Sequence, residues 1–181
     1  MKKKLTDQQQ TQTILPTPKV VVSEGTIAPD GNYYSSYEEF ARDAMSVTGT
    51  QNEDLAFALL NQLARAHGPV SEKTELSVNS ALTLLGTFQC ENAHEAMMAS
   101  HIIALHSHAT KLFIKASNQV HTELQKTYYE MAQKLLRSFT NMLEAFQKYR
   151  RNGTQKMEIK HVHLHSGAQA IIGTVHQKDT Q

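Results

Sequence analysis

The chain has 181 residues, 40% of them hydrophobic, and a formal net charge of +1. This length suits one domain with tails, and the balanced charge excludes a protein that is basic or acidic over its whole surface. Cys90 is the only cysteine, which excludes an intrachain disulfide and favours a reducing compartment. No run approaches the roughly 18 apolar residues of a membrane span. We therefore expect a cytoplasmic protein that does not enter a membrane.

Residues 1–36 are expected to form a flexible, disordered N-terminal arm. The segment QQQTQT is polar and of low complexity, LPTPK contains two prolines that favour extended backbone, and APDGNYYSS is rich in turn-forming residues. Between them, KVVVSEGT has the composition of a short strand that can add to a sheet elsewhere.

Residues 37–153 are expected to form a helical domain, whose first part contains three helices. YEEFARDAM is amphipathic, with two glutamates in its first turn. Asn52 is the expected N-cap of the second helix, and Gly68-Pro69 ends it. Ser71 opens the third. The expected buried leucines of the second and third helices are Leu55, Leu59, Leu60, Leu63, Leu76, Leu82, Leu84 and Leu85.

Two long amphipathic helices complete the domain. Residues 92–117 carry an apolar stripe that includes Met98, Leu105 and Leu112, while Ile103 and Ile114 fall nearly opposite. This helix is therefore expected to make two apolar contacts. It either lies at the centre of the bundle or is shared with a second subunit. Residues 119–151 carry apolar side chains at intervals of three and four, and Asn152-Gly153 ends the helix.

The last part of the chain, residues 154–176, is expected to form a short C-terminal β-hairpin around a Ser-Gly turn, followed by a tail at 177–181. The fold class is thus mainly α, a helical bundle with a short β element. A two-stranded hairpin is marginal alone in water, so it must pack on the helices or pair with another chain.

Several blocks in residues 54–175 carry a resemblance. They include DLAFALLNQLARA, NSALTLLG and NAHEAMMASHIIALHSHATKL, then a tyrosine-arginine helix end, a Gly-x-Gln-Lys link, a His-Val strand and the tail GAQAIIGTV. In these blocks the chain resembles a family of small uncharacterised bacterial proteins. The resemblance implies the domain boundaries and the helix-then-strand order, and it transfers no catalytic residue.

Three histidines, His161, His163 and His165, alternate along the first strand of the expected hairpin and share one face. Two neighbouring imidazoles on a strand can chelate Zn²⁺, and Ni²⁺ or iron are the other metals considered. A complete site needs further ligands, and a solvated strand face is the simpler interpretation. On the central helix, His94, His101 and His108 recur every seven residues, a spacing that favours packing over chelation. No resident cofactor is expected.

Charge is segregated along the chain. Residues 24–110 carry eleven acidic and three basic side chains, whereas residues 111–160 carry four acidic and ten basic ones. The basic cluster at the end of the last helix contains Lys148, Arg150, Arg151 and Lys156, which are candidate phosphate ligands for nucleic acid. Cations at a helix C-terminus are also expected for structural reasons.

The sequence shows no signature of an enzyme: it lacks G-x-S-x-G, Walker A and G-x-G-x-x-G motifs. The leading hypothesis is a non-enzymatic, self-associating interaction or structural protein, a homo-oligomer that also accepts a protein partner. Metal binding and nucleic-acid association are the alternatives. The candidate oligomer contacts are Ile103, Ile114, Val162, Leu164, Ile171 and Ile172.

Overall fold

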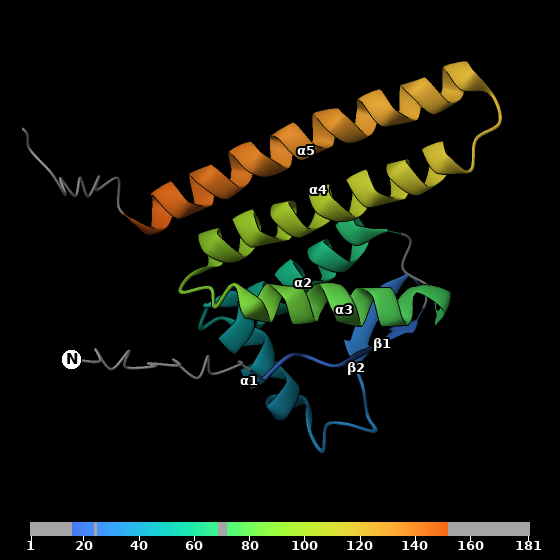
Figure 1. Ribbon diagram of the computed structural model, residues 1–181. Helices are drawn as coiled ribbons and strands as arrows, with labels where there is room; N and C mark the ends of the chain where they lie inside the picture. The colour runs from blue at the N-terminus through green and yellow to red at the C-terminus, as the bar shows by residue number, and fades with distance from the viewer. Residues whose placement is uncertain (1–15, 24, 69–71, 152–181) are drawn as a thin grey trace, which may run out of the picture.

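The structure is a computed structural model, and it describes residues 16–23, 25–68 and 72–151. It confirms a mainly helical fold with a small antiparallel hairpin (Figure 1). The elements are β1 (Val20–Ser23), β2 (Thr26–Pro29), α1 (Tyr37–Thr48), α2 (Glu53–His67), one 3-10 turn (Glu72–Thr74), α3 (Glu75–Thr87), α4 (Ala93–Ser117) and α5 (Thr122–Arg150).

The hairpin lies at the N-terminal side, where a flexible arm was expected over residues 1–36. Val20 and Val22 of β1 and Ile27 of β2 are buried in the core. The outer edge of β1 is covered by α3, because Asn79 accepts from Val20 N and donates to Val20 O, at 3.0 and 2.8 Å. An edge strand covered in this way needs no third strand. The expectation of a flexible arm is therefore corrected for residues 16–23 and 25–36, since three apolar side chains anchor them.

The expected C-terminal hairpin, residues 154–176, and the tail, residues 177–181, lie outside the described residues, and so do residues 1–15. Among the helices of the described part, none has the apolar length that a membrane crossing needs.

Asparagine side chains cap the starts of α2 and α4, and the first of these caps was expected from the sequence. Asn52 accepts from Leu55 N at 2.8 Å, and Asn92 accepts from Glu95 N at 3.1 Å. The turn after α1 depends on Gly49, which has φ 64° and lies against the backbone of residues 90–92. A Cβ at this position would overlap Cys90 O and Asn92 N. Only glycine combines the positive φ with this close approach.

The core lies where α1, α2, α3 and the first half of α4 meet the hairpin. Leu59, Leu60 and Leu63 of α2 are buried as expected, but Leu55 is 42% exposed because it lies in the first turn, at the edge of the bundle. Leu76 and Leu84 of α3 are likewise exposed. Ile103, a candidate oligomer contact, is only 4% exposed and belongs to this core. The prediction that Ile103 is an oligomer contact is therefore wrong, because this part of α4 lies at the centre of the bundle.

The helices α4 and α5 form a long antiparallel pair above the rest of the domain (Figure 1). Gln125 of α5 donates to Ala116 O of α4 at one end, and Arg150 pairs with Glu95 at the other. Although α5 has 29 residues and a full apolar stripe, it buries only Ala132 and Phe146. One side of α5 is thus packed on α4, and the rest of its stripe is partly or fully open.

Candidate functional site

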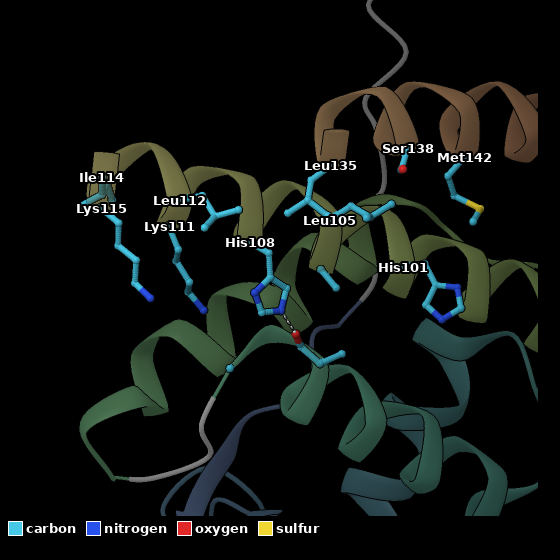
Figure 2. A pocket seen from close by; sticks show the side chains of 13 residues that line it. His101, Leu105, His108, Lys111, Leu112, Ile114, Lys115, Leu135, Ser138 and Met142 are labelled. Atoms are coloured by element: carbon cyan, nitrogen blue, oxygen red, sulfur yellow. Dashed lines mark hydrogen bonds between the residues drawn. The ribbon is translucent and has the colours of Figure 1, made fainter. Parts of the chain in front are cut away.

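A groove of about 1080 Å³ runs along α4, between α5 and the C-terminal end of α2. Its floor is α4 from His101 to Lys115, one wall is α5 at Leu135 and Met142, and the other wall is the end of α2 at Ala66 (Figure 2). A groove of this size lies at the upper end of the volumes typical of ligand pockets. Because α4 reaches past the end of α2, the tertiary arrangement leaves this face without a covering helix.

The α2 wall is held in place by two side chains of α4. His108 Nε2 donates to Ala66 O at 2.6 Å, and Lys111 Nζ donates to His67 O. Both cap carbonyls that the helix itself leaves without partners. The groove is therefore preformed, since its second wall is fixed to its floor.

His67 completes this junction. Its Nε2 lies 2.7 Å from Ser77 Oγ of α3. Burial lowers the pKa of His67, and the charges of Lys111 and His108 lower it further. His67 is therefore neutral at pH 7 and serves to join α2 to α3.

The chemistry of the groove is apolar with a basic margin. Leu105, Leu112, Leu135 and Met142 are among its apolar lining residues. In the part of the chain that the structure describes, the lining holds four basic side chains and no carboxylate, and the basic residues are His101, His108, Lys111 and Lys115. The hydroxyl of Ser138 donates to Lys134 O of its own helix at 3.2 Å. Such a surface is suited to binding an apolar partner that carries negative charge.

A second exposed apolar surface lies at the turn between α4 and α5. Ile114 is 55% exposed, Leu124 is 46% exposed and Met131 is 48% exposed, and Val120 and Tyr129 are open nearby. We call these five residues the distal face. Ile114 was a candidate oligomer contact from the sequence and remains one, since its side chain is available.

The other sequence-based candidates in the C-terminal segment lie outside the described residues. They are His161, His163 and His165 for metal, Lys156 for nucleic acid, and Val162, Leu164, Ile171 and Ile172 for oligomer contact. Within the part that the structure describes, no three His, Cys, Asp or Glu side chains come together in a metal-binding arrangement. The metal site on the His row stays a prediction.

The basic residues at the end of α5 differ in whether their charges are already paired. Lys148 and Arg151 are exposed, but the guanidinium of Arg150 lies 2.8 Å from Glu95 and donates to Phe88 O and Gln89 O, at 2.6 and 2.8 Å. It also lies 4.5 Å from the centre of the Phe146 ring. Arg150 thus connects α5 to the α3–α4 turn, which leaves Lys148 and Arg151 as the described cations available to phosphate.

Glu95 is the buried partner in this junction, with only 2% of its surface exposed. Burial raises the pKa of its carboxyl, but the hydrogen bonds from Arg150 and Glu91 N and the Arg150 charge outweigh that effect, so the pKa lies below the ordinary range. A buried carboxylate is stable here because its charge is paired and its oxygen accepts hydrogen bonds.

The structure also shows how far Cys90 and the three regularly spaced histidines of α4 are exposed. Cys90 is buried as a small core residue, and burial raises the pKa of its thiol to about 11. His94, His101 and His108 are exposed, so the expectation of partly buried packing histidines is wrong.

Sequence reasoning did not find the groove. The sequence feature that could have indicated the groove is the seven-residue interval between His101 and His108. The same interval continues to Lys115 on the same face of α4.

With the geometry described, the comparisons with known proteins add no relative. No family model, no curated protein and no solved structure matches the chain.

Proposed function

We propose that the protein is a non-enzymatic, self-associating interaction protein whose copies meet through the distal face of the α4–α5 pair. The observation that carries this proposal is the uncovered stripe of α5. Leu124 and Met131 are about half exposed on a helix that otherwise follows an apolar period. Exposed apolar side chains that cluster on one surface are typical of protein contact sites.

The geometry supports pairing between two copies. The ends of two long antiparallel helices can pack side by side as a four-helix bundle, with side chains of one pair between those of the other. Burial of apolar surface stabilises such a contact by about 25 cal/mol per Å² removed from water. A symmetric pair uses the same residues twice, so each substitution in the distal face affects the contact at two places.

The test is the molecular mass in solution, measured by size-exclusion chromatography with light scattering at about 50 µM, a concentration that populates complexes of micromolar affinity. We expect the wild-type chain to be larger than a monomer. The double variant Leu124→Asp/Met131→Asp should be a monomer, since carboxylates cannot enter an apolar contact without a large desolvation cost.

The matched control is Gln133→Asp. Gln133 is exposed on α5 but lies about 180° around the helix from Leu124, so this variant introduces a carboxylate on another face of the same helix. It should keep the wild-type mass. A wild-type monomer at this concentration, or a double variant with unchanged mass, would refute self-association through the distal face.

A further inference from the structure

The apolar side chains of the groove repeat at the interval of packed helices. Leu105 and Leu112 lie seven residues apart on α4, and Leu135 and Met142 lie seven residues apart on α5. Seven residues are two turns, or about 10.5 Å. Two facing rows with this repeat form holes that receive apolar side chains of a third helix at the same spacing.

The basic side chains follow the same repeat. His101, His108 and Lys115 are each seven residues apart on α4, with Lys111 between the last two. Figure 2 shows Lys111, Lys115 and His108 directed from α4 toward the α2 side of the groove, while Leu135 and Met142 come from the α5 side. The groove therefore has an apolar long side and a basic long side.

Charge identifies the kind of helix that fits. Among the described residues the lining carries no carboxylate, so acidic side chains along one flank of a bound helix would meet basic groups there. The C-terminal segment of this chain does not supply them, because residues 152–181 carry three lysines against one Glu and one Asp. A helix with basic or neutral flanks would gain no charge attraction from the basic side chains of α4.

We propose that the groove binds an amphipathic helix of another protein, one with apolar residues at heptad positions and Glu or Asp along the flank that faces α2. Apolar side chains fill the holes between α4 and α5, and the carboxylates of the flank meet Lys111, Lys115 and the two histidines. Helices bound in grooves are recognised in this way, by anchors at heptad-like spacing. Ile114 of the distal face also lines the groove, whereas Leu124 and Met131 do not, so the two surfaces meet at Ile114 and substitutions at Leu124 and Met131 leave the groove lining unchanged.

The probe is a designed, fluorescein-labelled peptide of about 21 residues, three heptads with Leu at positions a and d and Glu at e and g, because these positions set helix pairing. Its twin carries Lys in place of Glu. Like charges at e and g keep each peptide from pairing with itself. Binding to the full chain is followed by fluorescence anisotropy at low salt. We expect the Glu peptide to bind at least about tenfold more tightly than the Lys peptide.

The decisive variant is His101→Glu/Lys115→Glu. Both side chains are exposed, and neither is among the residues that cap α2, so circular dichroism should show an intact fold. This variant should reverse the preference and bind the Lys peptide more tightly. The Leu112→Asp variant should lose binding of both peptides by about tenfold or more, because a carboxylate then occupies an apolar hole.

Three results would overturn the proposal: equal affinity for the two peptides, no reversal in the charge variant, or no binding by the wild-type chain. Dissociation of a wild-type oligomer by the Glu peptide would also overturn it, because the occupant of the groove would then be a second copy. The Leu124→Asp/Met131→Asp variant separates this inference from the proposed function. This variant either is a monomer or keeps the mass of the wild-type chain. If it binds the Glu peptide normally in either case, peptide binding by the groove does not depend on self-association.

Discussion

Arg150→Ala should be among the most damaging substitutions on the surface of this domain. The arginine side chain is 35% exposed, yet its guanidinium contacts three residues far away in the sequence, Glu95, Phe88 and Gln89, and lies over the Phe146 ring of its own helix. The partner side chain, Glu95, is only 3% exposed. Truncation leaves a buried carboxylate without its cation and removes the donor from Phe88 O and Gln89 O.

The magnitude follows from the burial of the pair. Breaking a fully buried ion pair by removing one partner costs about 3–5 kcal/mol. Because Arg150 is one third exposed, water can approach Glu95 in the variant and lower this cost, so we expect a loss of about 2–3 kcal/mol in the free energy of unfolding. For a chain of this size that loss lowers Tm by roughly 4–12 °C.

The assay is urea unfolding followed by circular dichroism, with Arg151→Ala as the matched control. Arg151 is the next residue, is exposed, and within the described residues its side chain donates to Gln147 O of its own helix, so its loss should change stability by less than about 0.5 kcal/mol. A double variant gives a sharper test. Arg150→Ala/Glu95→Gln should be more stable than Arg150→Ala, because the unpaired buried charge is gone.

Equal stability of Arg150→Ala and Arg151→Ala would refute this reasoning, and so would a double variant less stable than Arg150→Ala. Either result would mean that the contacts of Phe146 and its neighbours hold α5 in place without the ion pair.

Three further predictions follow from the described contacts. Gly49→Ala should destabilise the fold by about 2–4 kcal/mol, from positive φ and overlap with the backbone of residues 90–92, whereas Gly31→Ala, with open space at its Cβ, should be near neutral in the same unfolding assay. The thiol of Cys90, with its pKa raised to about 11 by burial, should resist a thiol reagent at pH 8 in the native state and react quickly in urea. A native Cys90 that reacts as fast as the unfolded one would contradict this packing. Since the pKa of Glu95 is lowered in the folded state, its contribution is present above about pH 4.3 and is lost as pH falls through the lower folded pKa. The stability difference between wild type and Glu95→Gln should therefore shrink as the pH falls below about 4.3, and a constant difference would exclude this linkage.

Local chemistry let the sequence determine the helices and their boundaries. Asn52 and Asn92 cap their helices within one turn, and the apolar period of each helix is visible in a window of a few turns. The class of fold and the presence of two long helices follow from such short-range information. So does the burial of Leu59, Leu60 and Leu63, since these residues form the centre of a stripe.

Tertiary structure alone decided which apolar and charged groups are covered. Leu55 and Ile103 both belong to apolar patterns, but the first is exposed and the second is core, because only one of them faces a neighbouring helix. The Glu95–Arg150 pair joins residues 55 positions apart, and α3 completes the hydrogen bonds of β1 through Asn79. The groove exists because α4 extends beyond the end of α2. Periodicity shows which side of a helix is apolar, whereas burial and pairing depend on the length and position of every element that packs against it.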